Sequence, residues 1–284
     1  LGPVGNIILQ GSYILIHSDT AMACISRKEG KAFWTRRAAE KQTLSRVAVS
    51  GDRAFFAEGV GKKTADGPAI SGELESVSLT DGRSVWRVPL AGGPSGVIHS
   101  ETAGLVLATW DSGLVDARAV KDGQRVWTVN PAQRGGWWNP GMPVLWKDRL
   151  ILSGGQIVDV ATGKAATALH PLTGLPVPWN LPYKGFGCSM PNVVGDLLFS
   201  RGLDAAYYDL SNGGSMARLD GSRLACGWSV MPGSGVLAVL NGQQFGMCHC
   251  RNPIASPMGL VHDPDVETWT ISRFDTPKQE SIRR

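Results

Sequence analysis

Hydrophobic and polar positions alternate over short stretches along most of this chain. Runs such as residues 13–17, 53–57, 105–110 and 149–153 are rich in apolar side chains, and residues typical of turns separate them from their neighbours. Short apolar or alternating runs bounded by turn residues predict β-strands. No stretch keeps a 3.6-residue apolar period for more than three turns, and residues 38–45 form the only helix-like piece. The pattern therefore predicts an all-β protein.

One phrase recurs along the chain: an acidic or polar residue, Gly, three residues, then Trp. It occurs at residues 29–34, 81–86 and 122–127, and a decayed copy at residues 162–167 ends in Thr in place of Trp. The successive glycines are 52, 41 and 40 residues apart. A period of about 40–45 residues is that of a four-stranded propeller blade.

The residues around the phrase agree with this fold. Asp-Gly between two strand-like runs is a strong hairpin signal, because the turn needs a positive φ. The tryptophans Trp34, Trp86 and Trp127 then fall on the strand after the hairpin, at the same depth in each blade. We expect them to fill the wedge between neighbouring blades and to be structural.

Counting the repeats gives about six blades. Their approximate ranges are 5–36, 46–90, 95–130, 141–180, 187–231 and 235–264. A closed ring of seven or eight blades at about 42 residues each is longer than this chain. We expect either one blade completed by both termini or further sequence before residue 1, in a larger polypeptide or assembly. Residues 1–265 form the single propeller domain in this interpretation, and residues 266–284 form a polar tail.

The Gly-x-x-x-Trp repeats resemble those of the PQQ-repeat-like (quinoprotein-type) β-propeller family, over about residues 5–265. That family includes quinone-dependent alcohol dehydrogenases and a non-catalytic outer-membrane assembly lipoprotein. The C-terminal half, with its Cys…Cys…Cys-x-Cys order, is similar to large, mostly uncharacterised bacterial propellers that are often exported. The resemblance implies a fold and an extracytoplasmic location (periplasmic, cell-surface or secreted), and it implies no particular reaction.

Four of the five cysteines lie in the last hundred residues: Cys188, Cys226, Cys248 and Cys250. Two disulfides among them are the preferred interpretation, with Cys248 and Cys250 bonded to different partners, and four cysteines allow three pairings. The alternative is a zinc ion held by the four thiolates, although a Cys-x-Cys spacing is narrower than structural zinc usually has. We expect Cys24, which stands alone, to be a small core residue.

An enzymatic role is the second hypothesis. In the dehydrogenase branch of the resembling family, a quinone stacks between a Trp and a disulfide of adjacent cysteines, near Ca²⁺. This chain has no adjacent cysteine pair and no obvious acidic cluster, so we expect no quinone and no other cofactor. A polysaccharide lyase or hydrolase would need a base with a nearby Arg or metal. The five histidines show no metal-ligand spacing, and we list them as candidates only: His17, His99, His170, His249 and His262.

The preferred hypothesis is a non-catalytic extracytoplasmic propeller that binds or scaffolds a protein or glycan. Aromatic, amide and cationic side chains on loops between blades can stack on and hydrogen-bond a ligand. The candidate ligand-binding residues are Arg134, Trp137, Trp138, Asn139, Trp179, Tyr183 and Lys184. The net charge of +4 is scattered, which argues against nucleic acid, and no apolar run reaches the length of a membrane span.

Overall fold

The computed structural model describes the following residues, to which every structural statement below refers: 6–40, 42–59, 72–90, 92–94, 96–110, 112–130, 143–152, 155–170, 172–181, 191–202, 204–223, 230–233, 236–239 and 258–261. Within them the chain forms antiparallel β-sheets and one short 3-10 helix. No helix in this part of the chain is long and apolar enough to cross a membrane.

Three sheets come from the first half of the chain. The first contains β1 (Asn6–Gln10), β2 (Tyr13–His17), β3 (Ala21–Ser26) and β4 (Ala32–Arg37). The second contains β5 (Thr43–Leu44), β6 (Ala48–Ser50), β7 (Arg53–Gly59), β8 (Gly72–Ser78) and β9 (Ser84–Leu90). The third contains β10 (Gly96–Ser100), β11 (Leu105–Thr109), β12 (Val115–Ala119) and β13 (Arg125–Val129).

Three more sheets and a separate two-stranded hairpin sheet follow. The fourth contains β14 (Val144–Trp146), β15 (Arg149–Ile151) and β16 (Ile157–Asp159), and continues into a separate hairpin of β17 (Thr167–Leu169) and β18 (Pro176–Pro178). The fifth contains β19 (Asn192–Val194), β20 (Leu197–Gly202), β21 (Asp204–Asp209) and β22 (Ser215–Arg223), with the 3-10 helix η1 (Leu210–Asn212) before β22. The sixth contains β23 (Val230–Gly233), β24 (Val236–Val239) and β25 (Met258–Val261).

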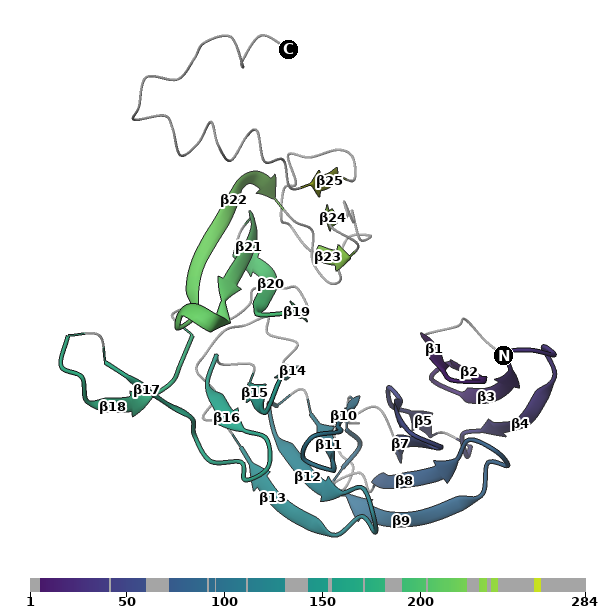
Figure 1. Cartoon of the computed structure of the whole chain (residues 1–284). Helices are drawn as coiled ribbons and strands as arrows, with labels where there is room; N and C mark the ends of the chain where they lie inside the picture. Colours follow the sequence, from purple (N-terminus) through teal and green to yellow (C-terminus); the bar gives the residue numbers. More distant parts are fainter. Residues whose placement is uncertain are drawn as a thin grey trace, which may run out of the picture.

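The sheets follow one another around an open arc in chain order, with β1–β4 at one end and β23–β25 at the other (Figure 1). In each of the three sheets from the first half, every strand pairs with the next one along the chain, apart from the split first strand β5 and β6. In each of these sheets the first strand lies on the inside of the arc and the last strand on the outside (Figure 1). This is the arrangement that the 40-residue repeat predicted.

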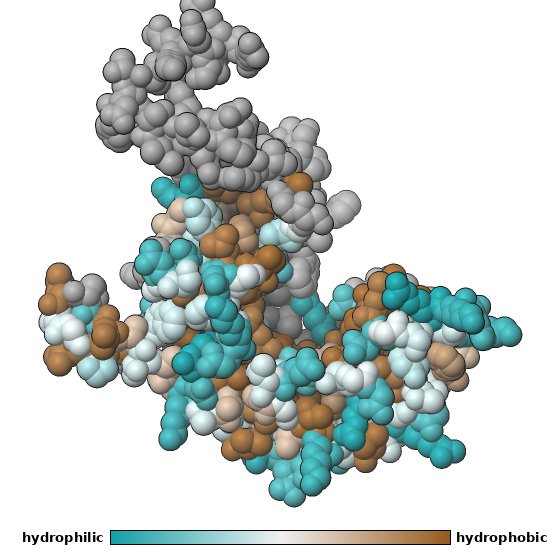
Figure 2. Space-filling model, in the orientation of Figure 1, coloured by the Kyte–Doolittle hydropathy of each residue, from teal (hydrophilic) through white to brown (hydrophobic). Residues whose placement is uncertain are grey.

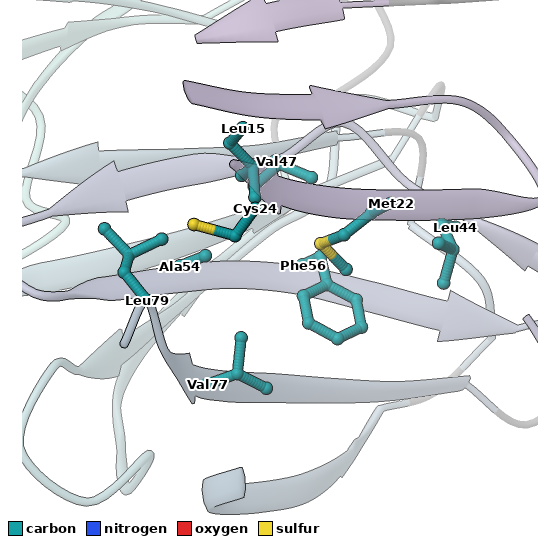
Figure 3. Close-up of a cluster of buried hydrophobic side chains, with 9 residues drawn as sticks. All are labelled: Leu15, Met22, Cys24, Leu44, Val47, Ala54, Phe56, Val77 and Leu79. Atoms are coloured by element: carbon teal, nitrogen blue, oxygen red, sulfur yellow. The ribbon is translucent and has the colours of Figure 1, made fainter. Parts of the chain in front are cut away.

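The core is built between sheets, with one apolar cluster at each of the first four interfaces. Between the first and second sheets, Met22 and Cys24 from β3 face Ala54 and Phe56 from β7, all fully buried (Figure 3). Similar clusters join the second to the third sheet, the third to the fourth, and the fourth to the fifth. Because side chains alternate between the two faces of a strand, an inner sheet needs apolar residues on both faces.

Two sequence expectations are refined by the structure. The described residues of this stretch, 38–40 and 42–45, are not helical: Thr43–Leu44 is the strand β5, and Leu44 is buried against the first sheet. Tertiary packing here overrides a weak local preference. The Asp-Gly hairpins are also longer than a two-residue turn: Ser78 N–H bonds to the Arg83 carbonyl, and of the turn residues only Gly82 has a positive φ. Asp81 contributes by accepting the Arg83 N–H at 3.1 Å.

Candidate binding surface

The three repeat tryptophans are structural, as the sequence predicted. Trp34 on β4 donates its indole N–H to the Leu79 carbonyl at 2.8 Å, and its ring covers Gly82 in the next sheet. Trp86 and Trp127 repeat this arrangement in the next two interfaces, on the carbonyls of Val120 and Val160. A Cβ built on Gly82, Gly123 or Gly163 would come within 2.7–2.8 Å of the ring. We call each such turn a tryptophan seat.

Trp179 lies at the interface between the fourth and fifth sheets. The decayed copy of the repeat has Thr167 where the other copies have the Trp that packs at such an interface. The side chain is half-buried, meets Trp146 edge-to-face with centroids 5.7 Å apart, and points its N–H at the Gly213 carbonyl at 3.4 Å. Leu181 occupies the space over Gly214, where a Cβ would lie 2.6 Å from its Cδ2. Trp179 therefore packs between the fourth and fifth sheets, and its predicted part in ligand binding stays a prediction.

The other predicted site residues lie outside the described ranges. They are Arg134, Trp137, Trp138, Asn139, Tyr183, Lys184 and the four cysteines Cys188, Cys226, Cys248 and Cys250. The predicted ligand site, disulfides and zinc alternative therefore stay predictions. In the described ranges, no group of three His, Cys, Asp or Glu side chains is placed to hold a metal ion.

The feature that sequence reasoning missed is the β17–β18 hairpin, which projects away from the sheets (Figure 1). It carries the three most exposed large apolar side chains of the described residues: Leu172 is 90% exposed, Leu169 72% and Leu175 63%. In Figure 2, the lobe that stands apart from the body in the same place carries hydrophobic residues on its surface. The sequence signal was available, because residues 165–183 contain no Asp, Glu, Lys or Arg.

The hairpin loop is held in one shape by hydrogen bonds. His170 Nδ1 accepts the backbone N–H groups of Leu172 and Thr173, both at 3.3 Å. The His170 carbonyl accepts the N–H of Gly174 at 2.8 Å, and Gly174 has a φ of +67°, which a residue with a Cβ adopts at a cost. Thus Leu172 and Leu175 are displayed on an ordered turn, and the role of His170 here is to shape that turn.

The two long edges of the hairpin differ. Hydrogen bonds from His170 N to Leu175 O and from Trp179 N to Ala166 O fix the alternation along the pair. In this register Pro176 and Pro178 lie opposite Leu169 and Thr167, at positions whose nitrogens face outward. Proline has no N–H, so the outer edge of β18 cannot donate to another strand there.

The outer edge of β17 is open by contrast. In the same register, the outward-facing backbone groups of β17 belong to Thr167 and Leu169, both exposed residues. In the described part of the chain no third strand joins this two-stranded sheet. An open strand edge beside exposed leucines is the geometry that accepts an extended apolar segment of another protein.

The buried polar residues elsewhere serve packing. Glu75 on β8, with a side chain 3% exposed, accepts hydrogen bonds from Arg36 of the first sheet at 2.9 and 2.6 Å and from Arg87 at 2.8 Å. Asp116 occupies the same position in the third sheet and is held by Arg118 and Arg125. These carboxylates are paired with guanidinium groups, so they offer no free base for acid–base chemistry.

The described histidines and the described cysteine are likewise part of the fold. Burial lowers the pKa of His17, opposed by Asp19 and the Ser45 backbone, and burial also lowers the pKa of His99, opposed by Glu101. His99 stacks on Phe55 with centroids 6.0 Å apart. Burial raises the pKa of the Cys24 thiol to about 11, in keeping with the predicted core role of this residue.

A scan against protein-family models finds no match for the chain, and no curated protein matches it. Solved structures do. BamB from Moraxella catarrhalis superposes with a TM-score of 0.55 at 16% identity, covering 82% of this chain and 68% of that one. The fold is a β-propeller.

Two further solved structures are also similar to the chain. The WD40 domain of Neurospora crassa Pan2 gives a TM-score of 0.52 at 12% identity, covering 83% of this chain and 71% of that one. A europium-containing methanol dehydrogenase gives 0.47 at 14% identity, covering 84% and 73%. The likeness to BamB and to the Pan2 WD40 domain identifies the successive sheets as propeller blades and confirms the predicted fold class. Closure at seven or eight blades stays a prediction.

Proposed function

We propose that this propeller is a protein-binding scaffold, and that its contact surface is the β17–β18 hairpin of the fourth blade. The observation that carries the proposal is the pairing of an open β17 edge with three exposed leucines on one uncharged hairpin. Single exposed apolar residues are ordinary, but three on one projecting hairpin are typical of an interaction site.

The partner that fits is an extended apolar segment of a protein. Backbone groups at Thr167 and Leu169 would hydrogen-bond to an added strand, while Leu169 and Leu172 contact its side chains. The proline-blocked edge of β18 restricts the addition to one side. A glycan fits this surface less well, since the hairpin offers neither charge nor an exposed aromatic ring among its described residues.

Placement outside the cytoplasm is part of the proposal. Its support is the cysteine pattern of the C-terminal half and the family resemblance, since disulfides persist in oxidising compartments. The quinone site of the dehydrogenase branch does not fit this chain, because no two cysteines are adjacent and Cys24 is a buried core thiol. The proposed function therefore includes no step through that cofactor.

The test compares proteins retained by immobilised wild-type chain with those retained by Leu172→Asp and Thr167→Pro. Leu172→Asp places a charge on the turn, and Thr167→Pro removes the outward N–H from the open edge. Val126→Asp is the matched control, since Val126 is 51% exposed on β13 of another blade. We expect a defined protein that binds wild type and the control but neither hairpin variant. Retention of the same proteins by all four chains would refute the hairpin as the contact.

A carbohydrate-active enzyme remains the alternative function. Its test is incubation of the chain with uronate-containing polysaccharides, followed by absorbance of the unsaturated product or by reducing-end assay. Our proposal predicts no turnover. Turnover that survives Leu172→Asp would favour the enzymatic function.

A further inference from the structure

The β17–β18 hairpin interrupts the outer strand of the fourth blade, and the register of the first three blades shows where. In those blades each repeat Trp lies opposite one residue of the neighbouring strand: Trp34 opposite Cys24, Trp86 opposite Ser76 and Trp127 opposite Ala117. The next residue of that neighbouring strand pairs with the second residue after the turn glycine, as Ile25 does with Ala32.

The fourth blade keeps both pairings but takes them from two separate segments of chain. Val158 pairs with Ala165, which is the second residue after the turn glycine. Ile157 donates its N–H to the Trp179 carbonyl at 3.0 Å, and the bridge one residue further along keeps this register. Trp179 therefore occupies the strand position of the repeat Trp, twelve residues later in the sequence than the phrase predicts.

Residues 167–178 are thus an insertion into a blade that is complete without them. If they are left out, Gly163 is followed by three residues and then Trp179, which is the repeat phrase. The two ends of the insertion already lie together, because Trp179 donates its N–H to the Ala166 carbonyl at 2.7 Å. The other blades have a β-bulge at this place, with a single extra residue such as Val126.

The core of the fourth blade does not use the inserted residues. Ala166 and Leu181, on either side of the insertion, are 7% and 4% exposed and belong to the cluster between the fourth and fifth sheets. None of the described residues between 167 and 178 is buried. Their hydrogen bonds in the described part of the chain, such as those that His170 accepts from Leu172 and Thr173, end within the hairpin or at its base. The exposed leucines therefore lie outside the propeller core.

We propose that residues 167–178 form a self-contained docking element, inserted into a blade that folds without it, and that this element takes one uncharged β-strand from another protein. The inference rests on the proposed function for the identity of the contact. It adds that the whole contact lies in the insertion, and it names the class of segment that binds.

The exposed face of the hairpin specifies that segment. Thr167 and Leu169 of β17 share a face with Pro176 and Pro178, and all four are exposed. A strand added beside β17 therefore places every second side chain next to Leu169 on an apolar surface. The hairpin has no Asp, Glu, Lys or Arg to pair with a charged strand. The partner strand thus carries apolar residues at alternate positions and no charge.

Two deletions test the insertion. Deletion of residues 167–178 joins Ala166 to Trp179, and the matched control, deletion of residues 167–179, also removes the Trp. We expect the first chain to unfold in one transition at the urea midpoint of wild type, because its outer strand stays closed. The second should unfold at a lower midpoint, because the interface loses the ring. A first deletion as unstable as the second would make the hairpin part of the blade and overturn the inference.

A phage-displayed library of random peptides, selected on the whole wild-type chain, tests the partner class. We expect uncharged peptides with alternating apolar residues, whose affinity falls about tenfold or more on the chain that lacks residues 167–178. Placing those residues between Val126 and Trp127 of the deletion chain should restore binding, because this is the corresponding bulge of the third blade. The bulge between Val85 and Trp86 is the second acceptor position.

The outcomes separate this inference from the proposed function. Peptides that bind wild type and the deletion chain equally would refute the hairpin as the contact, and the urea midpoints would still decide the insertion. Selection of charged peptides, or of none, would overturn the strand partner. Acceptor chains that fold without regaining binding, or that fail to fold in both positions, would show that the element is not self-contained. Dimerisation of wild type but not of the deletion chain would assign the edge to a second copy and overturn the proposal.

Discussion

The Trp34 ring lies so close to Gly82 that a Cβ at Gly82 would come within 2.8 Å of it. Trp34 belongs to the first blade and Gly82 to the second, so this contact joins two repeats. The indole N–H adds a hydrogen bond to the Leu79 carbonyl in the same turn. The Gly and the Trp of one Gly-x-x-x-Trp phrase thus act at different interfaces. The Gly of the second blade is covered by the Trp of the first, and the Trp of the second blade covers the Gly of the third.

Replacing Gly82, which the Trp34 ring covers, should therefore lower stability more than replacing Gly30, whose turn no described side chain covers. Gly82→Ala adds a clash with Trp34 to the strain of a left-handed φ, whereas Gly30→Ala adds the strain alone. We expect Gly82→Ala to lower the free energy of unfolding by about 1–3 kcal/mol more than Gly30→Ala. Urea unfolding of the isolated chain measures both. Equal losses would mean that the ring moves aside freely.

The indole N–H should also contribute beyond the ring. Trp86→Phe keeps an aromatic side chain over Gly123 but removes the hydrogen bond to the Val120 carbonyl. We expect a loss of about 1–2 kcal/mol in the free energy of unfolding. Val85→Ala is the control, because Val85 is the exposed neighbour on the same strand and should change stability little. A Trp86→Phe chain as stable as wild type would contradict the hydrogen bond's role.

The Arg36–Glu75 pair should couple the first two blades. Glu75 is buried and accepts two hydrogen bonds from Arg36, so Glu75→Gln removes that carboxylate and leaves Arg36 only its longer ion pair with Glu58 at 3.6 Å. We expect a loss of about 2–3 kcal/mol, below that of a fully buried pair because Arg36 is partly exposed. A double-mutant cycle with Arg36→Met measures the coupling. The exposed Arg83–Asp81 pair serves as control and should show almost none.

Stability should fall as the pH is lowered. Burial lowers the pKa of His17 and of His99 from the ordinary value of 6.5, so the unfolded chain binds protons more readily than the folded chain. The two histidines therefore leave stability undiminished above pH 6.5. As the pH falls below 6.5 toward their lowered folded-state pKa values, the unfolded chain takes up protons first and the free energy of unfolding decreases. Urea midpoints across this range measure the effect. His17→Gln and His99→Gln should flatten the profile, and an unchanged profile in both would contradict the assignment.

Cys24 should be unreactive in the folded chain. Its thiol is fully buried and its pKa is raised to about 11, so almost no nucleophilic thiolate forms at neutral pH. We expect iodoacetamide to leave the Cys24 peptide unmodified in native buffer and to alkylate it in denaturant, as read by peptide mass spectrometry. Modification at equal rates in both conditions would show that the β3–β7 cluster opens readily.

Much of the fold could be predicted because the repeat is local in sequence. Alternating apolar residues, turn glycines and the spacing of Trp34, Trp86 and Trp127 were enough to place the blades. The candidate binding hairpin could not be predicted, because Trp179 and the leucines lie in the same uncharged stretch and the sequence does not say which of them is exposed. In the structure, the Trp179 ring packs between the fourth and fifth sheets, where the decayed repeat has Thr167 in place of its Trp. The leucines of the hairpin are exposed.

The sequence alone determined the period, the strand class and the residues that recur at each turn, because these depend on neighbours in the chain. Only the tertiary structure decided which blade each Trp contacts, since Trp34 meets Gly82 across 48 residues of chain. It also decided that, among the described residues, no side chain covers Gly30 and that Ile7 and Leu9 are exposed. Burial is set by what packs on a sheet face, and strand sequence by itself does not say whether that neighbour is present.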